Sequence, residues 1–249
     1  MVVIPARYGS TRLPAKLLAG LCGHPVIWHT WQKAQASGVG RVVVATDHAD
    51  IATCITDGGG EVVMVEQDCP SGTDRIALAC MALGLPPGTI VVNLQGDEPG
   101  MPSQAIAQVV SILEQAPDCA MATLCVPLIG SREAQDPAVV KVVCNAQGRA
   151  LYFSRAPIPV SRDGGPVARF RHVGLYAYRL EALLELTALP PAPVELAESL
   201  EQLRALWHGM AIAVGEAVCD IPRGIDTPED LARWRGMDQG SVTLAGDRR

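Results

Sequence analysis

Hydrophobic and polar positions along the first half of the chain follow two alternating periods. Short runs rich in Val or Ile, each bounded by Gly, Asp or Pro, have the length and composition of buried β-strands. Between them lie longer segments with apolar residues at helical spacing, as at Ile106, Val109, Val110 and Leu113. The pattern predicts strands over 2–4, 41–46, 61–65 and 89–94, and helices over 26–36, 49–56, 74–83 and 103–115.

This alternation predicts an α/β fold with a mostly parallel sheet and helices on both faces. Right-handed crossovers then place the loops that follow the strands along one rim, where ligands usually bind. After about residue 119 the pattern loosens, and Pro- and Gly-rich turns separate strands expected at 120–126, 139–144, 150–153 and 172–178. We therefore expect one domain over residues 1–249, with a smaller mixed α+β lobe at roughly 127–190. Further helices are expected over 195–207 and after Thr227, which would cap the last one.

Composition narrows the class of function. The net charge of -6 and an aromatic content of 4% argue against a nucleic-acid-binding protein. The most apolar stretch, 119–129, is too short for a bilayer span, which needs about 20 residues. No basic leader with a long apolar region opens the sequence, so we expect a cytoplasmic protein without membrane insertion. The eight cysteines include no CxxC pair and are best interpreted as structural thiols in a reducing compartment.

A basic segment follows the first expected strand. Residues 5–16 contain Gly, Ser, Thr, two Arg and Lys16. At the carboxyl end of a strand, such a loop can supply backbone N–H groups and fixed cations to a triphosphate. The segment has neither the Walker spacing of glycines nor that of the dinucleotide fingerprint. On its own, a solvated basic loop is an equally good interpretation.

Three further segments offer polar chemistry at turns. Asp97, after the fourth expected strand, could hold Mg²⁺, which prefers hard oxygen ligands, although adjacent acids at a Gly-Pro turn are more often ordinary turn residues. The segment 71–75 could cap the next helix, or could present a hydroxyl and amides to a base edge. The segment 224–231 is a strand-to-helix turn in which Asp226 could be a second magnesium ligand.

Together these segments resemble the 3-deoxy-manno-octulosonate cytidylyltransferases, which make a CMP-activated sugar for lipopolysaccharide assembly. The matching segments, in order over nearly the whole chain, are 4–16, 45–47, 71–75, 92–99, 140–142, 150–159, 171–178, 200–204 and 224–231. The resemblance implies a Rossmann-like nucleotide-diphospho-sugar transferase fold. It implies transfer of CMP from CTP to the anomeric hydroxyl of 3-deoxy-D-manno-octulosonate, with release of pyrophosphate. It also implies Mg²⁺ as cofactor and a homodimer built on the smaller lobe.

The same resemblance assigns roles to individual residues. Asp97 and Asp226 would be the magnesium ligands and, with Lys16, the catalytic residues. The implied nucleotide-binding residues are Ala6, Arg7, Lys16, Ser71, Gly72, Arg75 and Gln95. The implied sugar-binding residues are Gln95, Arg155, His172, Tyr176, Glu201 and Gln202, of which Arg155 and His172 could bind the sugar carboxylate. Simpler alternatives remain open, because His172 and Tyr176 could face a core and Glu201 could be a solvated charge on a helix.

Three positions depart from the family's pattern. Ala15 stands where Gly is usual, Leu17 where Pro is usual, and Cys69 where His is usual. These changes leave the preferred sugar open, so an amino-octulosonate or a sialic-type nonulosonate is an alternative acceptor. A nucleotide-binding homologue that has lost catalysis is a second alternative, although both aspartates are retained. A Rossmann dehydrogenase is disfavoured, because the glycine fingerprint after the first strand is missing.

Overall fold

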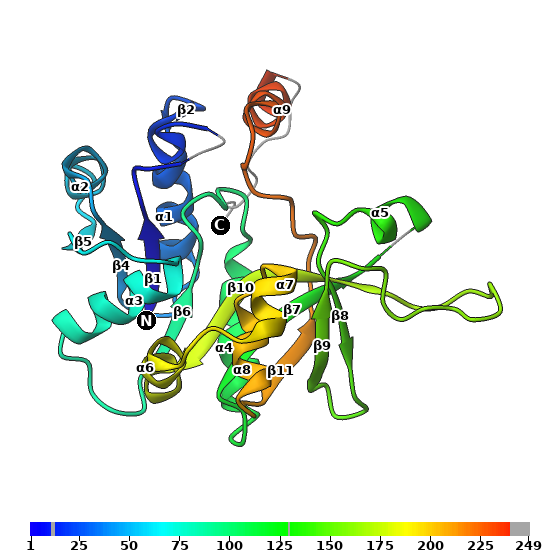
Figure 1. Ribbon diagram of the computed structural model, residues 1–249. Coiled ribbons are helices and arrows are strands. Elements are labelled where there is room, and N and C mark those ends of the chain that lie inside the picture. The colour runs from blue at the N-terminus through cyan, green and yellow to red at the C-terminus, as the bar shows by residue number, and fades with distance from the viewer. Residues whose placement is uncertain (11–12, 129, 240–249) are drawn as a thin grey trace.

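The computed structural model describes residues 1–10, 13–128 and 130–239 of the 249-residue chain. Its first half is built on parallel strands (Figure 1). β1 (Val2–Ala6) pairs in parallel with β4 (Val42–Thr46) and with β6 (Ile90–Asn93). β4 pairs in turn with β5 (Glu61–Met64), also in parallel. The strands expected from the Val- and Ile-rich runs are therefore present, and their carboxyl ends share one rim.

Helices cover both faces of this sheet. On one face α1 (Val26–Ala36), α2 (Ala49–Thr56) and α4 (Ser103–Glu114) pack in a core with Val2 and Ile4. On the other face α3 (Gly72–Ala82) and α6 (Leu180–Ala188) pack in a second core with Val3. Successive residues of β1 thus enter opposite cores, as expected for a strand buried on both faces. The α/β architecture predicted from the sequence is confirmed.

The second half adds mostly antiparallel strands. β10 (Phe170–Arg179) runs antiparallel to both β6 and β7 (Met121–Pro127), and β11 (Ile212–Glu216) lies parallel to β7. In the described residues the main path of the sheet is β11-β7-β10-β6-β1-β4-β5. β8 (Lys141–Cys144) and β9 (Ala150–Ser154) form a hairpin that leaves this path at β10. The hairpin, the short helix α5 (Ser131–Gln135) and the loop before β10 project to one side (Figure 1).

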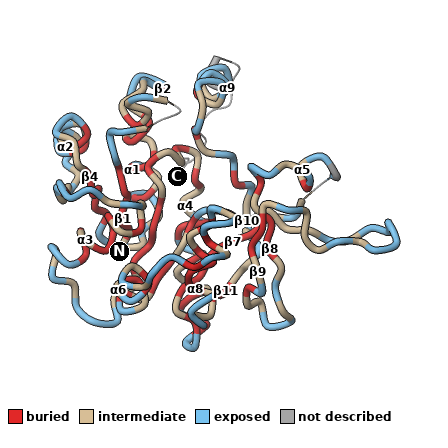
Figure 2. The backbone as a smooth tube through the Cα atoms, viewed as in Figure 1, coloured by how far each residue is buried: buried red, intermediate tan, exposed pale blue. Residues whose placement is uncertain are grey.

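Burial follows this layout (Figure 2). Buried positions concentrate in the central strands and the helices packed on them, and exposed ones in the projecting loop and the outer turns. Small elements that the sequence patterns did not indicate are η1 (Lys16–Leu18), β2 (Gly20–Leu21) and β3 (His24–Pro25). α9 (Pro228–Gln239) begins directly after Thr227, as expected. None of the helices in the described ranges has the length and apolar character needed to cross a membrane.

The prediction of one helix over 195–207 is wrong. The structure has two short helices there, α7 (Pro193–Glu198) and α8 (Gln202–Trp207). Between them Ser199 takes a left-handed conformation, with φ of 50°, which ends α7. The interruption changes which leucines face the core, because Leu196 is 67% exposed whereas Leu203 is fully buried. Glu201 accordingly lies at the start of α8, not in the middle of a helix.

Candidate active site

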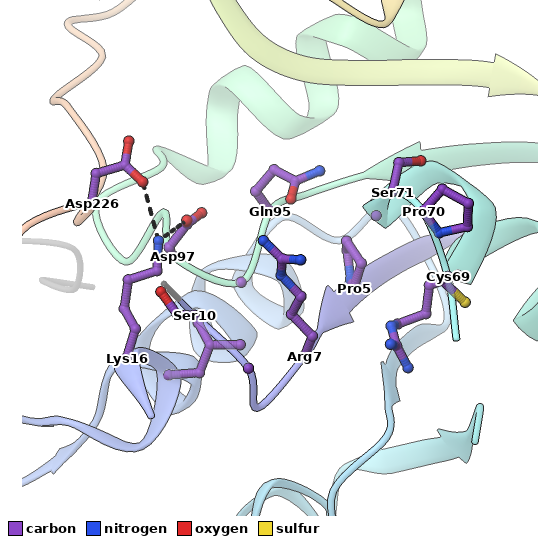
Figure 3. Close-up of a pocket in the computed structure, with 15 residues that line it drawn as sticks. Pro5, Arg7, Ser10, Lys16, Cys69, Pro70, Ser71, Gln95, Asp97 and Asp226 are labelled. Carbon is purple, nitrogen blue, oxygen red and sulfur yellow. Dashed lines mark hydrogen bonds and ion pairs between the residues drawn. The ribbon is translucent and has the colours of Figure 1, made fainter. Parts of the chain in front are cut away.

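A cavity of about 230 Å³ lies at the carboxyl ends of β1 and β6 (Figure 3). It is lined by Pro5, Arg7, Gly9, Ser10, Lys16, Leu17, Cys69, Pro70, Ser71, Gly72, Arg75, Gln95, Gly96, Asp97 and Asp226. Four segments therefore converge at this cavity: the basic segment 5–16, the cap of α3, the acidic turn 95–99 after β6, and the segment before α9. Thr11 and Arg12 of the basic segment lie outside the described residues. Ala6 is buried at the end of β1, and its two neighbours in the chain line the cavity.

Two acidic side chains from distant segments meet at Lys16. The Lys16 Nζ atom donates to Asp97 Oδ2 at 2.5 Å and to Asp226 Oδ1 at 3.2 Å. Asp97 lies in the turn after β6, and Asp226 lies in the segment that precedes α9 (Figure 3). The structure thus brings together the two carboxylates and the lysine that the resemblance assigned to catalysis.

Close backbone packing places Asp226 beside this turn. The Ile225 N–H donates to the Asp97 carbonyl oxygen at 2.9 Å. At Gly224, an added Cβ would lie 2.7 Å from Glu98 Oε1 and 3.0 Å from the Asp97 carbonyl oxygen. A side chain at this position would displace the Glu98 carboxylate and crowd the Asp97 carbonyl oxygen, so glycine lets the segment approach the turn closely. Gly224 is a residue of the site that the sequence assignment did not single out.

The backbone conformation of the loop before Lys16 shows what the change from the family's glycine to Ala15 costs. Ala15 has φ of 50° and ψ of 32°, the left-handed conformation that glycine adopts without cost. A residue with a Cβ atom pays about 1 kcal/mol there. The Leu18 N–H donates to the Ala15 carbonyl oxygen at 2.9 Å and closes the turn η1 that carries Lys16. Alanine therefore retains the turn at a modest cost in stability.

The turn after β6 combines burial with several negative charges. Burial, followed by the charges of Asp97 and Asp226, raises the pKa of Glu98 to about 8. Two carboxylates at a strand end suit Mg²⁺, which binds through one or two carboxylates and fills its other positions with water and phosphate oxygens. Within the described part of the chain, no three His, Cys, Asp or Glu side chains form a cage for a metal. The donor set fits an ion shared between the protein and a phosphorylated substrate.

Ser71 both caps α3 and faces the cavity. The Asp74 N–H donates to Ser71 Oγ at 3.2 Å, and the Ser71 N–H donates to Asp74 Oδ2 at 3.1 Å, which makes a capping box. Ser71 Oγ lies 2.7 Å from Asp74 Oδ2 and 2.9 Å from Glu201 Oε1, so two carboxylates share its proton. A Cβ at Gly72 would lie 3.3 Å from Gln95 Nε2, which shows how closely α3 begins against that amide. Ser71 therefore caps α3, as expected, and it also lines the cavity.

Arg75 lines the cavity, but its guanidinium is held by other groups. Its Nη1 donates to the Val65 carbonyl oxygen and its Nη2 to Asp47 Oδ2, both at 2.8 Å, and the residue is 4% exposed. Asp47 Oδ1 also accepts from the Tyr8 N–H at 3.0 Å. Asp47 therefore ties α3 to the basic loop. Sequence reasoning included this residue in the resemblance but gave it no role, although it directly follows β4 on the same rim.

Most of the residues assigned to the sugar lie on the β10 and α8 side. The Glu201 carboxylate accepts from Thr73 Oγ1 at 3.0 Å as well as from Ser71. Gln202 is 7% exposed, and its Nε2 atom has no hydrogen-bond partner among the described residues. The rings of His172 and Tyr176 have centroids 5.3 Å apart. The set assigned to the sugar thus meets the set assigned to the nucleotide at Ser71.

His172 and Arg155 are less available to a ligand than the resemblance implied. Burial, with a smaller effect of Arg171, lowers the pKa of His172 to about 3, so the imidazole is neutral, and its Nε2 lies 3.1 Å from Thr123 Oγ1. The Arg155 guanidinium donates to the carbonyl oxygens of Glu198, Pro137 and Ser199, at 2.7, 2.9 and 3.2 Å. Arg155 does not line the cavity.

A second hollow, of about 410 Å³, adjoins the cavity at Asp226. His172 lines this second hollow, together with Arg171 and Arg223. Sequence reasoning named neither of these two arginines as a site residue. Since Asp226 lines both hollows, the acidic pair lies at the boundary between them.

Comparison with known proteins identifies the family. Residues 1–212 match the model of a family described as cytidylyltransferase. The chain belongs to the cytidylyltransferase family. A 3-deoxy-manno-octulosonate cytidylyltransferase from Halorhodospira halophila is 52% identical to it, over 92% of this chain and 93% of the relative. One from Alkalilimnicola ehrlichii is 50% identical, over 93% of each chain. The resemblance predicted from the sequence is confirmed.

Solved structures agree with this assignment. The structure of CMP:2-keto-3-deoxy-manno-octonic acid synthetase complexed with CTP is 40% identical to this cytidylyltransferase. It superposes with a TM-score of 0.89 over 96% of this chain and 97% of that one. A cytidylyltransferase from Leptospira borgpetersenii serovar Hardjo-bovis, 18% identical, shares the fold with a TM-score of 0.64, over 97% of this chain and 87% of that one. Membership of this family removes the dehydrogenase alternative.

Proposed function

We propose that this cytidylyltransferase transfers CMP from CTP to the anomeric hydroxyl of 3-deoxy-D-manno-octulosonate, releasing pyrophosphate and supplying lipopolysaccharide assembly. One observation carries the proposal: Asp97 and Asp226 converge on the Lys16 ammonium in a cavity that also holds Arg7 and Ser71. Relatives with identities near 50% over the whole chain, named for this activity, support the choice of sugar.

The chain's own residues supply orientation and charge. In our proposal the anomeric hydroxyl attacks the α-phosphorus in line with the departing pyrophosphate, so no covalent intermediate on the enzyme is needed. Lys16 and Arg7 neutralise the triphosphate, and Ser71 with the amides at the start of α3 reads the cytosine. Figure 3 shows Arg7 pointing into the cavity toward Gln95, the residue assigned to both the nucleotide and the sugar.

Asp97 and Asp226 would hold the Mg²⁺ ion. When bound, such an ion neutralises phosphate oxygens and lowers the pKa of a coordinated hydroxyl. Burial is the main cause that raises the pKa of Glu98 to about 8, and the charges of Asp97 and Asp226 add to it; those charges favour a divalent cation at this turn. The Lys16 ammonium already lies between the two carboxylates, which supports a cation-binding role for the pair.

The acidic sugar would bind between Gln95 and α8. The buried Nε2 of Gln202, a donor without a partner among the described residues, supports a polar ligand on this side. Tyr176 and Glu201 would accept from or donate to sugar hydroxyls. Neutral His172 can donate one hydrogen bond. Arg155 would have to exchange at least one of its three carbonyl partners to reach the sugar carboxylate.

The proposal extends to assembly and location. We infer a homodimer through the smaller lobe at roughly 127–190, a segment in which Leu151 is 60% and Val160 77% exposed. Exposed apolar side chains in a projecting lobe support a surface that a second copy covers. We infer a cytoplasmic location, where CTP is synthesised, and no nucleic-acid partner.

Turnover with defined acceptors tests the function. Purified full-length protein is mixed with CTP, Mg²⁺ and one candidate acid at a time, and both pyrophosphate and the CMP-sugar are quantified. We expect 3-deoxy-D-manno-octulosonate to give the highest kcat/KM among eight- and nine-carbon acids. A strong preference for the amino variant or for a nine-carbon acid would overturn the choice of sugar. Binding of CTP without turnover of any acid would support the homologue that has lost catalysis.

A further inference from the structure

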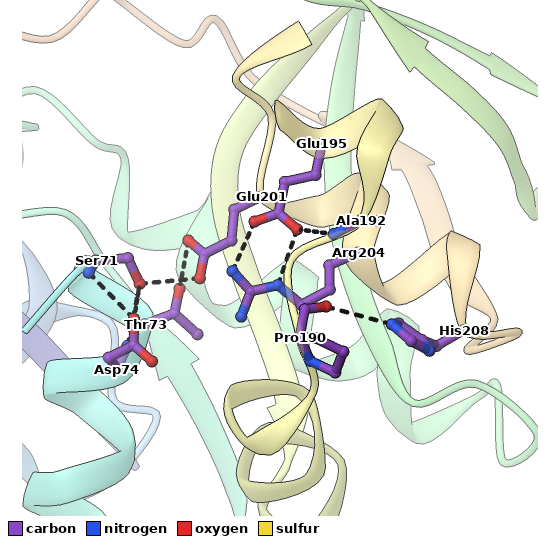
Figure 4. Close-up of polar contacts among 9 residues, drawn as sticks. All are labelled: Ser71, Thr73, Asp74, Pro190, Ala192, Glu195, Glu201, Arg204 and His208. Atoms are coloured by element: carbon purple, nitrogen blue, oxygen red, sulfur yellow. Dashed lines mark hydrogen bonds and ion pairs between the residues drawn. The ribbon is translucent and has the colours of Figure 1, made fainter. Parts of the chain in front are cut away.

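A buried ion pair joins the two short helices behind the cavity (Figure 4). The Nε and Nη2 atoms of Arg204 donate to the Glu195 carboxylate at 2.9 and 2.6 Å. Glu195 is 7% exposed and Arg204 is 9% exposed. The same carboxylate accepts from the Ala192 N–H at 2.9 Å. The loss of one partner would leave the other charge buried without its counter-ion, unlike the loss of a surface pair.

The pair spans the interruption between α7 and α8. Each of these helices has six residues, too few to be stable by itself. Ser199, in the left-handed conformation, separates them, and Glu195 and Arg204 lie on opposite sides of it. Across the break, the Leu200 N–H donates to the Glu195 carbonyl oxygen at 3.1 Å, and Leu200 and Leu203 add buried apolar contacts. The bidentate ion pair adds a directional side-chain link from Arg204 of α8 to Glu195 of α7, and so restrains how α8 is oriented relative to α7.

A continuous row of contacts leads from this pair to the nucleotide cavity. Glu201 lies one turn before Arg204, and the Arg204 N–H donates to the Glu201 carbonyl oxygen at 3.0 Å. The Glu201 carboxylate lies 2.9 Å from Ser71 Oγ and 3.0 Å from Thr73 Oγ1, at the start of α3. Figure 4 shows the contacts of Glu201 with Ser71 and Thr73 and those of Arg204 with Glu195. Neither member of the ion pair lines the cavity itself.

Charge also connects the pair to Glu201. Burial raises the pKa of Glu201, while the hydroxyls of Ser71 and Thr73 and the charge of Arg204 act in the opposite direction. The carboxylates that act on Arg204 are Glu195 first, then Glu201 and Asp74. If Glu195 were neutral, Glu201 and Asp74 would be the remaining carboxylates among those whose charges act on the guanidinium.

We propose that Glu195 and Arg204 are positioning residues for nucleotide binding: their ion pair holds Glu201 against Ser71 and Thr73, and so fixes the start of α3 at the cavity. The inference rests on the proposed function, because it takes CTP as the ligand of that cavity. Glu201 touches the residues of the site, whereas Glu195 and Arg204 act only through it.

Calorimetric measurement of the Kd for CTP, in the presence of Mg²⁺, tests this role. We expect Glu195→Gln and Arg204→Met each to raise the Kd about tenfold in the full-length protein. In a Glu201→Ala background, the same changes should alter the Kd less than twofold, because the contact that they position is already lost. The matched control is the exposed ion pair of Arg41 and Glu61. It lies where β4 and β5 begin, at the edge of the sheet opposite the rim that carries the cavity. Arg41→Met and Glu61→Gln should leave the Kd within twofold of the wild type.

The outcomes separate this inference from the proposed function. If the wild-type protein does not bind CTP, the proposed function fails. If it binds CTP and the folded Glu195→Gln protein binds equally well, only the positioning role fails. A tenfold rise that persists in the Glu201→Ala background would also overturn it, because the effect would then not pass through Glu201. Arg204→Lys, which keeps the charge but not the bidentate geometry, replaces Arg204→Met if circular dichroism shows that protein to be unfolded, and it should raise the Kd in the same direction.

Discussion

Gly224→Ala tests whether close backbone packing places Asp226 at the acidic turn. The new Cβ would lie 2.7 Å from Glu98 Oε1 and 3.0 Å from the Asp97 carbonyl oxygen, where ordinary contacts begin at 3.4 Å. The Glu98 carboxylate would be displaced and the segment would have to move from the Asp97 carbonyl oxygen by a few tenths of an ångström, and such overpacking typically costs about 1–3 kcal/mol. The hydrogen bond from the Ile225 N–H to the Asp97 carbonyl oxygen, 2.9 Å long, would lengthen, which adds about 1 kcal/mol.

The same displacement should reduce catalysis. Because a misplacement of about 1 Å in a reacting constellation can cost a factor of 10², we expect kcat to fall roughly 10- to 100-fold. Urea unfolding gives the stability of the variant, and pyrophosphate release with saturating CTP and sugar gives its kcat. Gly236→Ala in α9 is the control, because a Cβ there meets nothing within 4 Å, and it should leave kcat unchanged. Wild-type kcat and stability in Gly224→Ala would refute the packing argument.

Two further predictions concern neighbouring groups. Because the pKa of His172 falls from an ordinary 6.5 to about 3, the unfolded chain binds one more proton than the folded chain between these values, so this group makes stability rise with pH there. This group adds up to about 1.4 kcal/mol to the free energy of unfolding per pH unit in that range. Urea unfolding at several pH values should show a smaller pH slope for His172→Gln than for the wild type. An unchanged slope would contradict the neutral imidazole. Asp47→Asn should lower the free energy of unfolding by about 2 kcal/mol and raise the KM for CTP, because buried Arg75 loses its counter-ion. Thermal unfolding measures the first effect and CTP kinetics the second. An unaltered KM would contradict the role of Asp47 in holding the cavity together.

The spacing of apolar residues along the chain predicted much of the fold. The runs of Val and Ile and the helices with a clear apolar face were predicted almost to their ends, because each is decided by its own burial pattern. The interruption between α7 and α8 could not be predicted from the spacing of leucines, because the left-handed conformation of Ser199 does not change that spacing. α6 and β11 were also missed. Both depend on partners that only the folded sheet brings near, α3 for the helix and β7 for the strand.

The candidate site was predictable where it follows strand ends. Asp97 and Lys16 lie on the rim that parallel strands create. Asp226 was a candidate from its turn alone, and the resemblance paired it with Asp97. The roles of Gly224 and Asp47 came only from the structure. Gly224 matters because it has no side chain where two segments pack closely, and Asp47 acts through its contact with Arg75. Arg155 lies outside the nucleotide cavity, where its three carbonyl partners could not be read from the sequence.

The central claim is that Asp97 and Asp226 together hold the divalent cation needed for transfer of CMP. Its most direct test is pyrophosphate release as a function of Mg²⁺ concentration for the wild type, Asp97→Asn and Asp226→Asn, with circular dichroism to show that each is folded. We predict that both variants lose on the order of 10³ in turnover, about 4 kcal/mol of transition-state stabilisation, even at saturating Mg²⁺. Wild-type turnover and an unchanged Mg²⁺ requirement in either folded variant would contradict the account.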